Sequence, residues 1–102
     1  HNDQVLAWRI QNQETLLSLH LTIPEIAKTL NRSEKYIITN RMILRRFLNI
    51  SVIDQKREWV RQHQHDLETL SIEKIQEKYN IGRYVVQGYR KLLIELQQNG
   101  NG

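Results

Sequence analysis

Apolar residues recur along most of the chain at the three- and four-residue spacing of an amphipathic helix, and no stretch alternates as a half-buried strand would. Leu, Ile, Gln, Glu, Lys and Arg dominate the sequence, which has one Pro and four Gly. These residue types favour helices. We therefore predict an all-α protein. The predicted helices span about 3–20, interrupted near Asn12, then 23–30, 34–48, 55–69, 72–79 and 83–98.

Residues at the segment ends support these boundaries. Thr22 stands three residues before Glu25, which is the spacing of a capping box at a helix amino terminus. Asn31 suits the left-handed conformation that ends a helix. A short break is therefore expected between 23–30 and 34–48. The other expected N-caps are Asp3, Ser33, Asp54 and Ser71, and Asn80 with Gly82 is expected to form a second such turn.

The chain contains an internal repeat. Residues 22–44 align without a gap on residues 71–93 after a shift of 49 positions, with five of 23 positions identical. The matches fall on expected caps, turn and core positions, so they are more informative than their number. Upstream, a Trp precedes each copy, although the two stretches differ in length by two residues. The repeat predicts two tandem three-helix modules, 1–48 and 54–98, joined by a short apolar linker, 49–53, and followed by a flexible tail, 99–102.

The shortness of the middle helix in each copy indicates how the copy folds. A helix of about eight residues is not stable alone, so it must dock on its neighbours. A short helix, a tight turn and a longer helix, braced by a preceding helix, form a helix-turn-helix arrangement. In that arrangement the last helix is held so that one face can enter the major groove of DNA.

The charge distribution favours a polyanionic partner. The net charge is +4 and the isoelectric point is near 9.6. Residues 31–48 carry a net +4 and residues 81–102 a net +2, whereas residues 1–30 and 49–80 each carry −1. The excess of positive charge therefore lies in the two segments that follow the predicted turns, as expected for a protein that binds a polyanion. The alternative is that this charge serves solubility alone.

The pattern of the first copy of the repeat resembles the homeodomain-like class of helix-turn-helix proteins. This class includes Myb/SANT-type units and the three-helix modules of bacterial regulators and transposases. The resemblance is carried by Trp8, Leu16 and Leu17, the stretch EIAKTLNRS at 25–33, and Ile37 with Asn40 and Arg41. It covers 8–48 well and 59–96 more weakly, because Gln76 stands where a small alanine is usual. The resemblance implies a DNA-binding module and no particular target sequence.

The longest predicted helices divide into a core face and an outer face. Ile37, Leu44 and Leu48, flanked by Tyr36, Ile43 and Phe47, form the expected core face of 34–48, and Val86, Leu92 and Leu93 that of 83–98. Lys or Arg can pair with guanine, and Asn or Gln with adenine, from the outer face. Gly88 would let its backbone approach a ligand closely. The predicted base-reading residues are Lys35, Thr39, Asn40, Arg83, Tyr84 and Gln87, and the predicted phosphate contacts are Arg32, Ser33, Arg45, Arg46 and Lys91.

Arg41 and Arg90 occupy the same repeat position, beside core positions. Two roles are open for them: a phosphate contact, or an internal ion pair, which we favour. The expected ion-pair partners are Glu14 or Glu25 for Arg41, and Glu68 or Glu73 for Arg90.

Other chemistry finds little support in the sequence. His63 and His65 are two residues apart on a predicted helix and point to different faces, so we expect no metal site. No nucleophile with a base, Gly-rich phosphate loop or carboxylate cluster is evident, so we expect no enzymatic activity, cofactor or small-molecule substrate. The aromatic residues are expected to anchor the core rather than stack on bases; these are Trp8, Trp59, Tyr36, Tyr79 and Tyr89.

We therefore expect sequence-specific binding of double-stranded DNA by a transcription regulator. The alternatives are the bipartite DNA-recognition part of a transposase, recombinase or phage packaging protein, and a SANT-like protein-interaction module. No segment has the length of a membrane span and no signal-peptide pattern is present, so an intracellular, DNA-associated location in cytoplasm, nucleoid or nucleus is expected. The first residue, His1, suggests a trimmed or tagged chain, which is compatible with a larger parent chain. A homodimer is a separate partner that the sequence leaves open.

Overall fold

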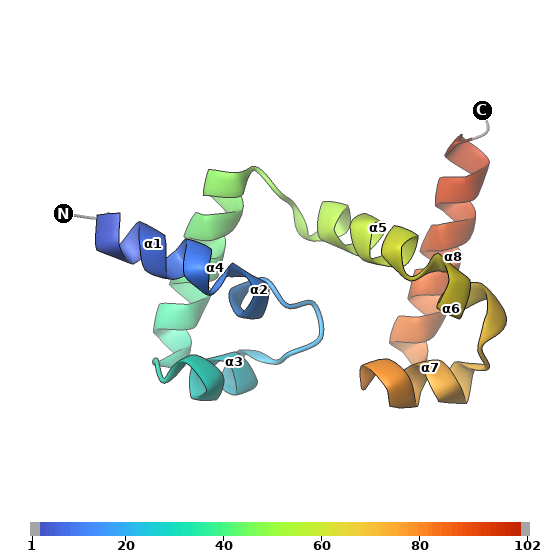
Figure 1. Cartoon of the computed structure of the whole chain (residues 1–102), viewed down its shortest axis with the longest axis horizontal. Coiled ribbons are helices and arrows are strands. Elements are labelled where there is room, and N and C mark those ends of the chain that lie inside the picture. Colours follow the sequence, from blue (N-terminus) through green and yellow to red (C-terminus); the bar gives the residue numbers. More distant parts are fainter. Residues whose placement is uncertain (1–2, 101–102) are drawn as a thin grey trace. The chain divides into compact units, whose positions relative to one another are not determined.

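The computed structural model describes residues 3–100, which form eight helices and no strand (Figure 1). The prediction of an all-α protein is therefore confirmed. None of the described helices is both long enough and apolar enough to cross a membrane. The chain divides between Ser51 and Val52 into two compact units, called here the first and the second unit. The helices are α1 (Asp3–Gln11), α2 (Gln13–Leu16), α3 (Ile23–Leu30), α4 (Glu34–Leu48), α5 (Val52–Gln62), α6 (Gln64–Thr69), α7 (Ile72–Tyr79) and α8 (Arg83–Gly100).

The first unit is built on α4, which contacts α1, α2 and α3 (Figure 1). Trp8 of α1 packs against the core and meets the ring of Tyr36 edge to face, with ring centroids 5.5 Å apart. Such a pair is worth about 1 kcal/mol beyond its buried area. The buried side chains are Leu16, Leu17, Ile26, Ala27, Ile37 and Leu44.

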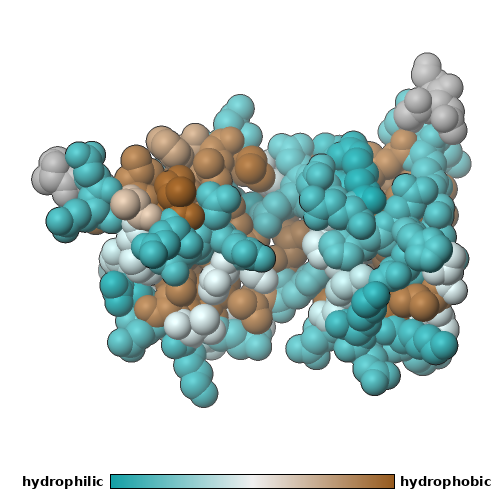
Figure 2. Space-filling view, in the orientation of Figure 1, coloured by the Kyte–Doolittle hydropathy of each residue, from teal (hydrophilic) through white to brown (hydrophobic). Residues whose placement is uncertain are grey.

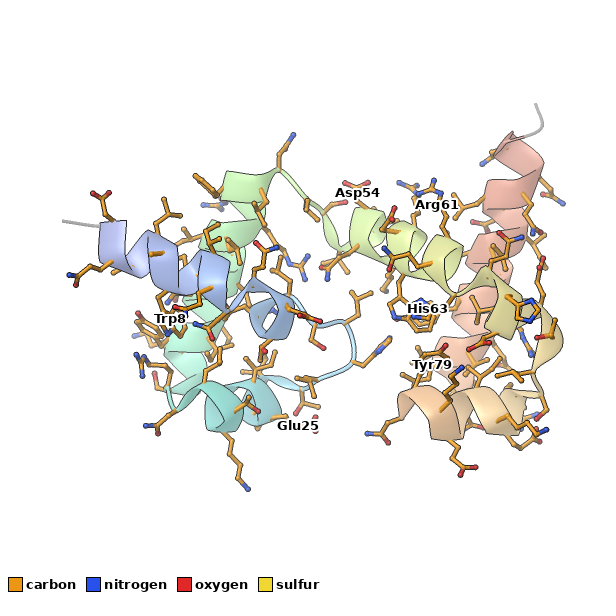
Figure 3. All side chains as sticks on the ribbon, viewed as in Figure 1. Trp8, Glu25, Asp54, Arg61, His63 and Tyr79 are labelled. Atoms are coloured by element: carbon orange, nitrogen blue, oxygen red, sulfur yellow. The ribbon has the colours of Figure 1, made fainter. Side chains whose placement is uncertain are left out.

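The second unit is built on α8 in the same way, with contacts from α5, α6 and α7. Trp59 stacks on His63, with ring centroids 4.0 Å apart, and meets Tyr79 edge to face at 5.1 Å. Figure 3 shows His63 and Tyr79 facing each other. Both tryptophans therefore pack against a core, as predicted. The buried side chains are Val60, Leu67, Ile75, Val86, Tyr89 and Leu93.

The first helix of each unit is interrupted at equivalent residues, Asn12 and His63. The Asn12 Nδ2 atom donates to the carbonyl oxygen of Trp8 over 2.9 Å, and His63 Nδ1 lies 2.7 Å from the carbonyl oxygen of Trp59. A side chain that enters the backbone ladder in this way bends a helix. The break at Asn12 was predicted, but the continuous helix predicted over 55–69 is wrong. A shift of 51 residues, which aligns Trp8 with Trp59, also aligns Asn12 with His63.

Four predicted boundaries lie elsewhere in the structure. The first helix stops at Leu16 rather than near residue 20. Asp3 lies in the first turn of α1 rather than before it. Helix α5 begins at Val52, inside the predicted linker, and Asp54 is therefore a first-turn residue and not the N-cap. The β-branched side chains at 52 and 53 lower helix propensity by only a few tenths of a kcal/mol, too little to delay a helix whose later turns pack. Helix α8 continues to Gly100, so the predicted flexible tail is helical through that residue, and 101–102 lie outside the described residues.

Candidate nucleic-acid interface

Side-chain caps and a left-handed residue fix the amino terminus of α3 and the connection from α3 to α4. Thr22 and Glu25 form the predicted capping box: the Thr22 Oγ1 atom accepts from the Glu25 amide and Glu25 Oε1 accepts from the Thr22 amide. The backbone bond from Thr22 holds the pKa of Glu25 below its ordinary value. Asn31 is left-handed, with φ 55° and ψ 51°, and Ser33 Oγ accepts from the amide of Tyr36. The orientation of α4 on α3 is therefore set locally.

Equivalent caps are present at the amino terminus of α7 and in the connection from α7 to α8. Ser71 Oγ accepts from the Lys74 amide, and Asn80 is left-handed, with φ 54° and ψ 52°. Gly82 replaces Ser33 of the first unit, and its carbonyl accepts the first helical bond of α8 from Val86. None of the described glycines has a positive φ, so Asn80 alone supplies the left-handed residue of this turn.

Helix α4 buries one face and exposes the other. Ile37 and Leu44 are fully buried, whereas Phe47, predicted to flank the core, is 58% exposed. Figure 2 shows an apolar area on the surface of the first unit. The exposed residues among those predicted to contact DNA in this unit are Arg32, Ser33, Lys35, Thr39 and Arg46.

Asn40 does not belong to the outer face, and its prediction as a base-reading residue is wrong. Its side chain is 3% exposed. Its Nδ2 atom donates to the carbonyl oxygen of Tyr36 over 2.7 Å, and its Oδ1 atom accepts from Arg9 Nε over 2.6 Å. The amide is turned inward because Arg9 of α1 approaches it there, so it cannot present its edge to a base.

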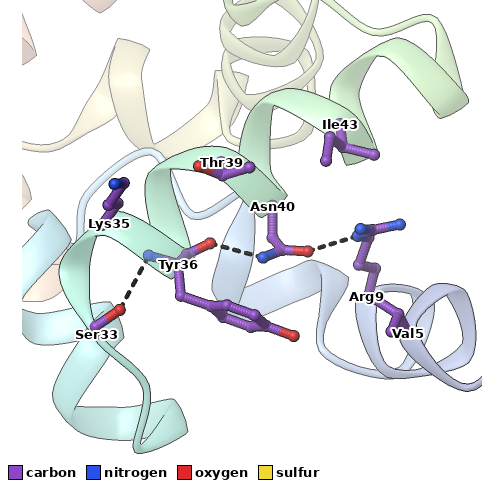
Figure 4. A pocket seen from close by; sticks show the side chains of 8 residues that line it. All are labelled: Val5, Arg9, Ser33, Lys35, Tyr36, Thr39, Asn40 and Ile43. Atoms are coloured by element: carbon purple, nitrogen blue, oxygen red, sulfur yellow. Dashed lines mark hydrogen bonds between the residues drawn. The ribbon is translucent and has the colours of Figure 1, made fainter. Parts of the chain in front are cut away.

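A groove of about 500 Å³ runs between α1 and α4, beside the outer face of α4. Figure 4 shows Lys35 and Thr39 on one side of it and Arg9 on the other, with Asn40 between them. Two cationic side chains thus lie along one hollow that also has apolar walls. The groove is lined by Val5, Arg9, Ser33, Lys35, Tyr36, Thr39, Asn40 and Ile43.

The arginines of the first unit differ in their surroundings. The guanidinium of Arg32 lies over the rings of Trp8 and Tyr36, 5.3 and 5.9 Å from their centroids. Arg45 is half-buried, and burial followed by the nearby charge of Arg41 lowers the pKa of its guanidinium. Arg46 is exposed in the last turn of α4. Positive charge is thus concentrated at the carboxyl-terminal end of α4, where it also interacts favourably with the helix dipole.

A second hollow, of about 350 Å³, lies between α3 and α4. Ile38 and Met42 are exposed there beside the arginines of α4. This side of α4 therefore combines apolar and cationic groups. Its lining consists of Ile23, Ile38, Arg41, Met42, Arg45 and Arg46.

Helix α8 exposes all of its residues that were predicted to contact DNA. Tyr84 is 86% exposed, and an added Cβ at Gly88, one turn later on the same side, would meet open space. A ligand can therefore approach the backbone beside the Tyr84 ring. The exposed predicted residues of α8 are Arg83, Tyr84, Gln87 and Lys91.

Arg90 has an internal role, but not the predicted one. Its Nε and Nη2 atoms donate to the carbonyl oxygens of Leu67 and Leu70, at 3.0 and 2.5 Å. The ion pair predicted with Glu68 or Glu73 is therefore replaced by bonds to the end of α6. Glu68 instead accepts from Gln97 Nε2 over 2.8 Å.

His63 serves packing, whereas His65 is exposed. His63 is held by Trp59 and Tyr79, and within residues 3–100 no group of three or more His, Cys, Asp or Glu side chains is placed to hold a metal ion. Sequence reasoning missed Arg9, because a lone arginine on the first helix carries no signal of its own. The signal lies in the comparison of the two units, since the equivalent residue of the second unit is the buried Val60.

No family model, curated protein or solved structure matches the chain. Its function is therefore inferred from its own geometry and charge.

Proposed function

We propose that the chain binds double-stranded DNA sequence-specifically, with α4 and α8 as the recognition helices of two tandem three-helix helix-turn-helix modules. The observation that carries the proposal is the outer face of α4. Lys35, Thr39 and Arg46 are exposed at spacings of four and seven residues, which place them on one side of the helix. The opposite side is anchored in the core by Ile37 and Leu44.

The dimensions of the parts support this proposal. An α-helix with its side chains is about 10–12 Å across, and the major groove of DNA is about 12 Å wide. The connection from α3 to α4 is short, and the left-handed Asn31 and the Ser33 cap favour one orientation of α4 on α3. A rigid helix with one free cationic face is what a groove-reading element requires.

The charges of α4 also support a phosphate ligand. Arg41 and Arg45 are one helical turn apart, and Arg45 is half-buried. Phosphate oxygens accept parallel hydrogen bonds from arginine particularly well, so the arginines at this end of α4 suit a phosphate ligand.

The second unit would add a second, differently composed contact. Its outer residues Arg83, Tyr84 and Gln87 offer hydrogen bonds and an aromatic ring, and Lys91 offers a charge. Two modules in one chain raise each other's effective concentration at the DNA, so each can be weak alone. A transcription regulator is the leading role. The DNA-recognition part of a transposase, recombinase or phage packaging protein would use the same interface, and a nuclease-like region in the parent reading frame would favour it.

The test is the affinity of the whole chain for random-sequence duplex DNA between 50 and 200 mM salt. The logarithm of the association constant falls with a slope of about −0.9 per neutralised phosphate, so four charged contacts predict a loss on the order of 100-fold. The four are Arg32, Arg45, Arg46 and Lys91. A weak affinity that does not change with salt would overturn the proposal.

A second candidate function rests on the hollow between α3 and α4. Ile38 and Met42 are exposed beside Arg45 and Arg46, a combination of apolar and cationic side chains that also suits an acidic amphipathic peptide. The SANT-like interaction module is therefore the alternative. A flat salt response with DNA, together with binding of an acidic helical peptide that Met42→Glu abolishes, would favour it.

A further inference from the structure

Two equivalent positions are filled by a polar pair in the first unit and by a more apolar pair, a valine and a tyrosine, in the second. A shift of 51 residues aligns α1 with α5 and places Val60 at the position of Arg9. A shift of 49 aligns α4 with α8 and places Tyr89 at the position of Asn40. Arg9 and Asn40 are hydrogen-bonded to each other, whereas Val60 and Tyr89 belong to the core of the second unit.

The more apolar pair is accommodated in the core of the second unit. Val60 is fully buried and Tyr89 is 4% exposed. Burying a polar group costs free energy unless its hydrogen bonds are satisfied, and well-packed apolar substitutes for buried polar pairs are often neutral or stabilising. Stability alone therefore gives no reason for Arg9 and Asn40 in the first unit.

The polar pair does fix a guanidinium at the edge of the candidate interface. Asn40 is anchored by its bond to the Tyr36 carbonyl, and its Oδ1 atom accepts a hydrogen bond from Arg9 Nε. This bond restrains the Arg9 guanidinium, and Arg9 and Lys35 both line the groove (Figure 4). A pre-oriented guanidinium loses little freedom when it binds an oxyanion with two parallel bonds.

We propose that Arg9 binds a backbone phosphate of the DNA and that Asn40 positions the Arg9 guanidinium for this contact. The groove between α1 and α4 is then where one DNA strand passes the first unit. This inference rests on the DNA-binding function proposed above and adds a contact from α1 to it.

The main test replaces Arg9 and Asn40 by the residues found at the equivalent positions of the second unit. The variant is the whole chain with the double substitution Arg9→Val and Asn40→Tyr. The melting temperature is expected to stay the same or rise. Affinity for random duplex DNA at 50 mM salt is expected to fall about tenfold, and the salt slope to become shallower by about 0.9, the value of one phosphate. Arg61→Ala is the control, because it also removes one positive charge but lies on α5. It should change neither the affinity for DNA nor the salt slope.

The positioning role is tested with single substitutions. Asn40→Leu keeps the charge of Arg9 but removes the hydrogen bond that holds its guanidinium, so the affinity for DNA should fall about threefold. In a chain that already carries Arg9→Gln, Asn40→Leu should cause no further loss of affinity, because the two residues act through one contact. Arg9→Gln also serves as the deciding variant if the double variant does not fold.

The possible outcomes distinguish a failure of the Arg9–phosphate contact from a failure of the proposed DNA-binding function. If the wild type binds DNA and the double variant, or Arg9→Gln, binds with the same affinity and slope, the pair is structural and the inference is overturned. Equal losses from Asn40→Leu with and without Arg9 would remove the positioning role. If the wild type shows no salt-dependent binding, the proposed function itself fails.

Discussion

Arg90 donates hydrogen bonds from one guanidinium to two carbonyl oxygens at the end of α6, and the bond to Leu67 is 3.0 Å long. The last carbonyls of a helix have no partner within it, so they need donors from elsewhere. Arg90 supplies them from α8, 20 and 23 residues away in sequence. It thereby joins the two halves of the second unit without any acidic partner.

Arg90→Ala should destabilise the second unit by about 2 kcal/mol, because a hydrogen bond to a charged group is worth about 1.5–3 kcal/mol and the carbonyls would lose their donor. Urea unfolding followed by the fluorescence of Trp59, in a Trp8→Phe background, measures this unit alone. Arg41→Ala at the equivalent position of the first unit is the matched control, with an expected change of less than about 0.5 kcal/mol. Equal losses in the two variants would contradict the capping role of Arg90.

Local signals allowed most of the helices to be predicted from the sequence. The boundaries of α3, α4 and α7 follow from caps and turn residues within a few positions, such as Thr22, Ser33 and Asn80. The apolar spacing in α4 correctly identified Ile37 and Leu44 as buried. Such features depend on neighbours along the chain, which the sequence displays directly.

Features that depend on distant partners could not be predicted. Asn40 lies at the edge of the apolar stripe of α4, and whether it turns inward is decided by Arg9, 31 residues away. Arg90 was given acidic partners because backbone carbonyls, its actual acceptors, have no signature in a sequence. Which outer residues touch a ligand remains a prediction, since exposure is necessary for contact and does not establish it.

The double substitution Arg45→Ala and Arg46→Ala should weaken binding to all duplex sequences by a similar factor, because phosphate contacts carry no sequence information. The salt slope should become shallower by about 1.8, the value of two phosphates. The same measurement on Arg57→Ala with Arg61→Ala removes equal charge from α5, where both arginines lie in ion pairs with Asp54 and Glu58. A loss equal to that control would show that only total charge matters.

Acid should destabilise the second unit through Asp66. Hydrogen bonds from Lys78, at 2.6 Å, and from Tyr79 hold the pKa of Asp66 below its ordinary value. A carboxyl whose pKa is lower in the folded state contributes stability above its unfolded pKa, about 4, and that contribution is lost as the pH falls through the folded value.

Asp66→Asn should therefore unfold more easily than the wild type at pH 7, and the difference should disappear as the pH falls through the folded pKa of Asp66. Thermal unfolding between pH 2 and pH 7, read through Trp59 in the Trp8→Phe background, measures the difference. Glu77→Gln, an exposed position on α7, is the control and should follow the wild type. Parallel curves for Asp66→Asn and the wild type at every pH would rule out a role for this carboxyl in acid unfolding.

Gln87 and Lys91 lie four residues apart on the exposed side of α8 and should differ in what they recognise. An amide can pair with two groups on the edge of adenine, a discrimination worth about 1–3 kcal/mol, whereas an ammonium attracts any phosphate. After a preferred site has been selected from a randomised duplex library, Gln87→Ala should lose preference at one base pair and keep its salt slope. Lys91→Ala should bind every sequence more weakly and show a slope shallower by about 0.9. If Gln87→Ala instead weakened all sequences equally, Gln87 would not be a base-reading residue.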